Sequence, residues 1–203
     1  MRIVARDLEA EQSYRLLTGI VVPRPIAWVS SLSAGGKVNL APFSAFTFVS
    51  PKPPLLAISI GRKGGIYKDT AMNILAREDY VVHIADGPLT EAVHLSSAEF
   101  APEVSEVDEL GLETIASEQV KVPRLAAAPI AMECRLRHCI EFGETRSRLI
   151  VGEVLLFHIR DELLRFGKID TAELDPIARL GGPNYARLGD IVTLSPVFQT
   201  AKS

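Results

Sequence analysis

Basic and small residues gather in one short stretch of this 203-residue chain, RKGGIYKDT. Arg62, Lys63 and Lys68 supply positive charge, and the two glycines allow the backbone to approach a ligand closely. Asp69, as an N-cap, and Thr70 open a segment with helical spacing, whose first N–H groups have no intrahelical partner and carry partial positive charge. This combination suits one small phosphate group. A solvated basic loop in front of a capped helix explains the same residues.

A second group of polar residues lies in PRPIAWVSS and VNLAPFSAF, among apolar and aromatic neighbours. Ser30, Ser31, Asn39 and Ser44 fall on segments that we expect to form adjacent strands. Pro42 interrupts the second segment and frees backbone groups that a sheet would otherwise pair, and such groups can bind the edge of a planar heterocycle. An edge strand with turn-forming residues also explains the prolines, but not the clustered hydroxyls.

Familiar catalytic and metal-binding patterns are missing from the sequence. There is no G-x-S-x-G, H-E-x-x-H or G-x-G-x-x-G motif, so no catalytic residue is identified. The histidines are scattered singly, and Cys134 and Cys139 have no second ligand pair, so we predict no metal site. Five residues apart in a strand, the two cysteines face opposite sides, and we expect them to stay unpaired in a reducing compartment.

Charge and hydropathy exclude several classes of partner. The chain has 22 basic and 25 acidic residues, a net charge of −3, which argues against non-specific binding of nucleic acid. Its N-terminal 17 residues carry charges throughout and lack the apolar run of a secretory signal. The longest apolar stretch, residues 149–159, is about half a membrane span. We therefore expect a cytoplasmic protein with no membrane association.

The hydrophobic pattern predicts mostly strands. Helical spacing covers residues 8–17 and 70–78, and short helices flank a polar excursion, 87–122, that we expect to form a lid or a dimer arm. Residues 25–32, 38–50 and 55–61 are expected to form an antiparallel meander with a proline break before the third strand. Further strands are predicted at 80–86, 130–143, 147–161, with a bend or bulge at Gly152, and 191–198.

At least six strands without a βαβ rhythm predict one domain, residues 1–203, formed by a closed or nearly closed antiparallel barrel with peripheral helices. Several strands are apolar on both faces, which indicates that the outside of the barrel is covered as well. Helices or a second subunit can provide that cover, and a homodimer is the simpler source.

Five short motifs occur in a specific order: PRPIAWVSS, NLAPFSAF, VSPKPP, KDTAMN and RLGGPNY. In this order they resemble the flavin reductase-like family, particularly its flavoredoxin-like branch, over residues 16–191. The resemblance implies a mainly β, Greek-key-like antiparallel split barrel that forms a homodimer and binds FMN near the subunit interface.

The resemblance also implies a set of cofactor-binding residues. Ser30 and Ser31 would lie near the phosphate and ribityl chain, and Asn39, Ala41 and Ser44 along the ribityl chain and ring edge. The phosphate-side residues would be Arg62, Lys63, Lys68, Asp69 and Thr70. Arg179 and Tyr185, in the last motif, would lie near the flavin, while Trp28 would belong to the core.

Three functions follow from the resemblance and stay open at this stage. The first is an NAD(P)H-dependent flavin reductase, in which flavin N5 accepts hydride and the protein supplies positioning. The second is an FMN-binding electron carrier that is reduced by an electron-transfer protein. The third is the same barrel without flavin. The sequence contains no nicotinamide-binding fingerprint, so it selects neither NADH nor NADPH, and it does not identify the final acceptor.

Overall fold

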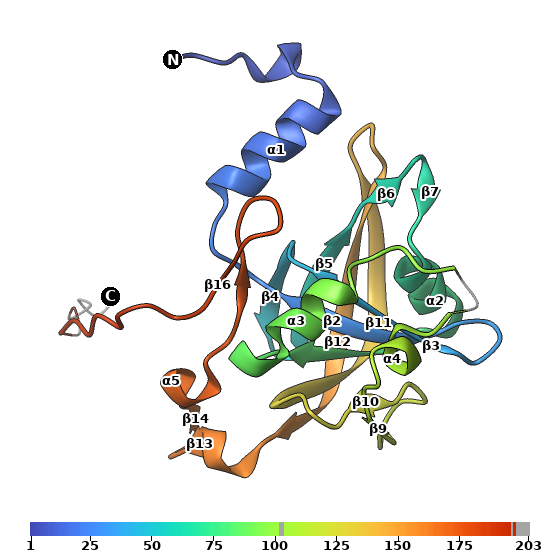
Figure 1. The fold of residues 1–203 in the computed structure, drawn as a ribbon, viewed down its shortest axis with the longest axis vertical. Helices are drawn as coiled ribbons and strands as arrows, with labels where there is room; N and C mark the ends of the chain where they lie inside the picture. Colours follow the sequence, from blue (N-terminus) through green and yellow to red (C-terminus); the bar gives the residue numbers. More distant parts are fainter. Residues whose placement is uncertain (102–103, 196, 198–203) are drawn as a thin grey trace, which may run out of the picture.

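The chain folds around one antiparallel sheet that curls into a barrel, as a computed structural model of residues 1–101, 104–195 and 197 shows (Figure 1). Along the sheet the strand order is β3-β2-β8-β11-β12-β5-β4. The strands are β2 (Ala27–Leu32), β3 (Val38–Phe43), β4 (Phe46–Pro51), β5 (Pro54–Ile60), β8 (Asp79–Ile84), β11 (Ile130–Phe142) and β12 (Ser147–Ile159). The predicted mainly β, antiparallel architecture is confirmed.

The barrel closes at a two-residue corner. β3 and β4 are consecutive in the chain but lie at opposite ends of the strand order, joined only by Ser44 and Ala45. Phe43 and Phe46 both pack into the interior, although residues three apart in one straight strand would face opposite sides. The chain must therefore break between them, so the predicted single strand over 38–50 and the simple meander built on it are wrong.

The barrel interior is filled by apolar side chains and sealed by helix α2 (Asp69–Arg77). Ala71 and Ile74 of this helix join the interior cluster with Val29, Ile58 and Val82, among others. Lys68, with an extended backbone, occupies the N-cap position, so the expectation that Asp69 caps the helix is wrong. Asp69 is instead the first helical residue, where a negative charge is favoured by the helix dipole.

The segment predicted as a lid or dimer arm forms a second layer on the barrel. It contains η2 (Gly87–Leu89), α3 (Thr90–Leu95), α4 (Glu106–Glu109) and β9 (Thr114–Ile115), and β10 (Arg124–Leu125) follows. Trp28 and Leu40 on the outer face pack against Val93 and Val107 of this layer. Trp28 is fully buried, as expected. The second layer of the same chain thus covers this part of the outer face, for which a second subunit was expected as the simpler source of cover.

Helix α1 (Ala10–Ile20) lies outside the barrel (Figure 1), and none of its residues is buried. It begins two residues later than predicted, and the Glu9 N–H donates to Gln12 Oε1 at 3.0 Å at its first turn. A short 3₁₀ turn, η1 (Ala5–Asp7), precedes it. Within the described parts of the chain, no helix has the length and apolar character needed to cross a membrane.

Several short elements complete the structure. A hairpin of β6 (Arg62–Lys63) and β7 (Ile66–Tyr67) contains the two glycines of the basic loop, both at positive φ. A small sheet joins β1 (Arg24–Pro25), β15 (Ala178–Arg179) and β16 (Tyr185–Ala186). In the chain, four short elements lie between β12 and β15: η3 (Asp161–Leu163), β13 (Leu164–Arg165), β14 (Lys168–Ile169) and α5 (Thr171–Leu174).

The predicted last strand, 191–198, is wrong where the structure describes it. Residues 191–195 form neither helix nor strand, and positions 196 and 198 lie outside the described residues. Ile191, Val192 and Leu194 are exposed, so their apolar character does not place them in the sheet.

Candidate functional site

A groove runs along β3, between α2 and the second layer. Three adjoining cavities form it: a turn cavity of about 410 Å³, a central cavity of about 420 Å³ and a C-terminal cavity of about 340 Å³. The turn and central cavities share Asn39, Asp69, Phe100 and Glu106. The central and C-terminal cavities share Pro42, Lys68 and Ser97. Each cavity has the size of a small-molecule site, which spans roughly 300–1,000 Å³.

A polar network joins β2, β3 and α2 at the groove floor. Asn39 Oδ1 accepts hydrogen bonds from Thr70 Oγ1 at 2.8 Å and from Ser31 Oγ at 3.2 Å. Asn73 Nδ2 in turn donates to Ser31 Oγ at 3.1 Å. Three residues predicted from separate motifs are therefore brought together, and Asn73 is an addition that the sequence analysis did not identify.

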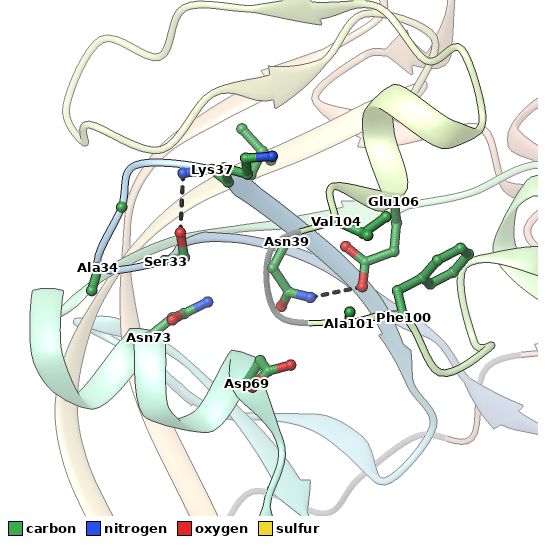
Figure 2. Close-up of a pocket in the computed structure, with 12 residues that line it drawn as sticks. Ser33, Ala34, Lys37, Asn39, Asp69, Asn73, Phe100, Ala101, Val104 and Glu106 are labelled. Atoms are coloured by element: carbon green, nitrogen blue, oxygen red, sulfur yellow. Dashed lines mark hydrogen bonds between the residues drawn. The ribbon is translucent and has the colours of Figure 1, made fainter.

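Glu106 of α4 faces this network from the other side of the groove (Figure 2). Its Oε1 accepts from Asn39 Nδ2 at 2.8 Å, and its Oε2 accepts from the Leu40 backbone N–H at 2.9 Å. Burial raises the pKa of the Glu106 carboxyl, and the negative charge of Asp69 adds to the rise, while the hydrogen bonds from Leu40 and Asn39 oppose it. Glu106 therefore fixes the Asn39 amide and places a carboxyl group in the groove.

Two lysines bring positive charge to the central cavity, which the carboxyl groups of Asp69, Glu99 and Glu106 also line. Lys63 and Lys68 both border it, beside the first residues of α2, Asp69 and Thr70. Lys63 forms an ion pair with Glu99, whereas Lys68 lies over the Phe43 ring with its Nζ 5.4 Å from the ring centroid. Loss of water around its ammonium group, together with the like charge of Lys63, lowers the pKa of Lys68. This end of the cavity suits an anionic group.

Two of the predicted site residues lie elsewhere. Ser30 is fully buried, and its hydroxyl donates to the Pro123 carbonyl at 2.9 Å, because neighbouring residues of a strand point to opposite faces. Arg62 lines none of the three cavities and places its guanidinium carbon 4.2 Å from the centroid of the Tyr67 ring. Arg148 packs on the same ring at 3.3 Å. Ser30 and Arg62 therefore contact other parts of the protein and not the groove.

The remaining predicted residues line the groove, except Ser31, which is fully buried and is connected to the groove through its hydrogen bond to Asn39. Ala41 borders the central cavity, and Ser44, Arg179 and Tyr185 border the C-terminal cavity. Arg24 Nε donates to Ser44 Oγ at 3.2 Å, and its Nη2 donates to the Leu180 carbonyl at 2.9 Å. This arginine connects the first motif to the last one.

The residues that the second layer contributes to the groove could not be identified from the sequence. Phe100, Glu106 and Ser97 reach the groove from a segment whose motifs indicated only short helices. Ser105 precedes α4, and its hydroxyl accepts from the Asp108 N–H at 3.4 Å, so the start of this helix has a local signal in the acidic run that follows Ser105. It carried no signal that one of its carboxylates would face Asn39.

Comparisons with known proteins agree on one family. The model of the flavin reductase like domain matches residues 19–170. An uncharacterized protein of Bacillus subtilis, YwrF, is 41% identical over 94% of this chain and 96% of its own. The structure of nitrilotriacetate monooxygenase component B from Bacillus cereus matches with a TM-score of 0.92 at 38% identity, covering 96% of this chain and 98% of that one.

A second structure, Pseudomonas fluorescens 2-nitrobenzoate 2-nitroreductase NbaA, matches with a TM-score of 0.84 at 37% identity over 99% of both chains. Flavoredoxin of Desulfovibrio vulgaris shares the fold, with a TM-score of 0.77 at 19% identity over 95% and 96% of the two chains. The barrel thus has the split-barrel fold of the flavin reductases. The chain belongs to the flavin reductase-like family, and the predicted resemblance is confirmed.

Proposed function

We propose that this protein is an FMN-dependent oxidoreductase that uses NAD(P)H to reduce its flavin or a downstream acceptor. The central cavity carries this proposal, because one wall combines Lys63, Lys68 and the start of α2, which suit a phosphate, with a floor of amide and hydroxyl groups. The names of two relatives, a monooxygenase component and a nitroreductase, support a redox role for this chain.

The residues of the groove bind and orient the cofactor in this proposal. Lys63, Lys68 and Thr70 would hold the phosphate, while Asn39, fixed by Glu106, would present its amide to the ribityl chain. Bound flavin supplies the hydride chemistry at N5. Since such a transfer needs no protein acid or base, the chain's contribution is position and electric field, and no catalytic residue is assigned.

The spectrum of the purified protein tests the proposal directly. We expect a yellow protein whose flavin absorbance near 450 nm disappears when NADH or NADPH is added without oxygen. Oxidised flavin that persists with both nucleotides would refute the reductase. Protein that stays colourless after incubation with FMN would support a barrel without flavin.

An electron carrier is the second candidate. The lack of a nicotinamide fingerprint and the fold shared with flavoredoxin favour it. In that case the protein would bind FMN tightly, would not turn over nicotinamide, and would be reduced only by a reduced electron-transfer protein.

We also propose that the protein is a cytoplasmic homodimer. The exposed apolar residues of α1, which include Leu17 and Ile20, support the dimer because no residue of this helix is buried within one chain.

A further inference from the structure

The C-terminal cavity has an unusual balance of charge. Arg24, Lys68 and Arg179 all line it, and no aspartate or glutamate does. Within the described parts of the chain, none of these three cations forms an ion pair with a carboxylate. Lys68 also borders the central cavity, where the flavin phosphate would pair with it, so the two arginines are the cations that favour an anionic ligand in the C-terminal cavity.

The two arginines differ in what they can offer. Arg24 is almost fully committed, since it donates to Ser44 Oγ and to the carbonyls of Thr18, Val21 and Leu180. Arg179 donates from Nε to the Gly182 carbonyl and from Nη1 to the Tyr185 hydroxyl. An arginine has five N–H donors, so one hydrogen on Nη1 and both on Nη2 stay uncommitted at Arg179. Both Nη atoms therefore keep a hydrogen that can be donated to a carboxylate.

The cavity walls suit a small organic molecule. Tyr14 and Tyr185 border the cavity with the apolar residues Ile26 and Pro42. A volume of about 340 Å³ lies at the lower end of the range for small-molecule sites, about 300–1,000 Å³. The cavity also adjoins the central cavity through Pro42, Lys68 and Ser97, so a molecule bound here lies next to one bound there.

We infer that the C-terminal cavity is a binding site for a small organic acid, whose carboxylate pairs with Arg179 while flavin occupies the central cavity. The role of the acid rests on the proposed function, because the acid would be the second substrate of the flavin-dependent enzyme. The site itself depends only on Arg179 and the walls described above.

Benzoate and its uncharged analogue benzamide test the site. Binding of each to flavin-loaded protein would be measured by isothermal titration calorimetry. We expect benzoate to bind and Arg179→Met to weaken it about tenfold or more, since a paired hydrogen bond between charged groups is lost. Benzamide should bind weakly and equally to both proteins. Arg6→Met, which changes an exposed arginine that lines none of the three cavities, should bind benzoate like the unaltered protein.

Three results would overturn the inference: equal affinity of benzoate for the Arg179→Met variant, equal binding of benzoate and benzamide, or competition between benzoate and FMN. An unchanged midpoint of urea unfolding shows that Arg179→Met is folded, and Arg179→Lys, with its charge but no paired donors, should bind benzoate with intermediate affinity. If the protein takes up no flavin but benzoate binding still depends on Arg179, the proposed function fails and the acid site stands.

Discussion

Asn39 is held at both ends of its side-chain amide. Its oxygen accepts from Thr70 and Ser31, and its nitrogen donates to Glu106, so the neighbours determine which way the amide points. An amide that is fixed before a ligand arrives loses little conformational freedom on binding. Asn39, which the sequence suggested as a ligand contact, is therefore oriented in advance by Glu106, which the sequence did not suggest.

Lys68 and Arg62 provide a matched pair for testing the phosphate position. Lys68→Met should weaken FMN binding about tenfold or more, because a charge-assisted contact to the phosphate is lost, and should leave riboflavin almost unaffected. Arg62→Met should change neither, since this guanidinium packs on Tyr67. Quenching of flavin fluorescence measures both affinities. Equal losses for FMN and riboflavin in Lys68→Met would contradict the position of the phosphate.

Gly152 makes a contact that no other residue allows. A Cβ built there overlaps the Tyr80 hydroxyl and ring, and that hydroxyl has no hydrogen-bond partner in the described parts of the chain. Gly152→Ala should lower the free energy of unfolding by about 2–3 kcal/mol, as overpacking does, measured by urea denaturation. The sequence suggested a bend or bulge at this glycine, and the structure has a bulge opposite it, between Leu136 and His138 of β11.

Two further variants serve as controls for that result. Gly189→Ala should leave stability unchanged, because nothing lies within 4 Å of a Cβ at that position. Adding Tyr80→Phe to Gly152→Ala should restore part of the lost stability. A Gly152→Ala variant as stable as the unaltered protein would show that the close contact is not maintained in solution.

Among the elements, strand β11 holds the second layer through one buried carboxylate. Glu133 is fully buried and accepts from the backbone N–H groups of Glu118, Gln119 and Val120, and it also bonds His158 Nε2 at 2.6 Å. Burial alone would raise its pKa, but the bonds from His158 and the backbone outweigh burial and lower the pKa of Glu133. The loop at 118–120 therefore depends on an ionised carboxylate.

Glu133→Gln should destabilise the protein at neutral pH by about 2–3 kcal/mol, because a charged acceptor of several bonds is replaced by a neutral one. A carboxyl with a lowered pKa in the folded state stabilises the protein above its unfolded pKa, and this contribution disappears as the pH falls through the folded pKa. The gap between the two proteins should therefore narrow below about pH 4. Urea unfolding between pH 3 and 7 measures it, and a constant gap would contradict an ionised Glu133.

Local patterns predicted the elements well, and distant contacts limited the rest. The glycines of the basic loop and the helical spacing of α2 act within a few residues, so the loop and the helix were located from the sequence, whereas the pairing of β6 with β7 inside the loop was not predicted. The break between Phe43 and Phe46 depends on where the barrel closes, and the position of Glu106 depends on docking 66 residues away from Leu40. Neither contact has a signature in its own stretch of chain.

At the scale of the whole molecule, α1 offers the clearest test of assembly. In a single chain, Leu17 is 60% exposed and Ile20 is 73% exposed. Large apolar side chains that are exposed together often mark a protein–protein interface. The double variant Leu17→Glu and Ile20→Glu should halve the mass measured by light scattering after gel filtration. Phe166→Glu, a similar change at the exposed β13–β14 turn, should leave it unchanged. A monomeric unaltered protein would contradict the proposed homodimer.

The hydrogen bond from the Leu40 amide to Glu106 has a consequence for dynamics. Leu40 lies in β3, at the end of the strand order, and gives this N–H to a side chain of the second layer. The exchange of the Leu40 amide hydrogen with deuterated water therefore requires that α4 separates from β3. Amides that are hydrogen-bonded between strands exchange only when the barrel itself opens. The exchange rate of the Leu40 amide thus reports, in the native protein, how often α4 separates from β3 and opens the groove.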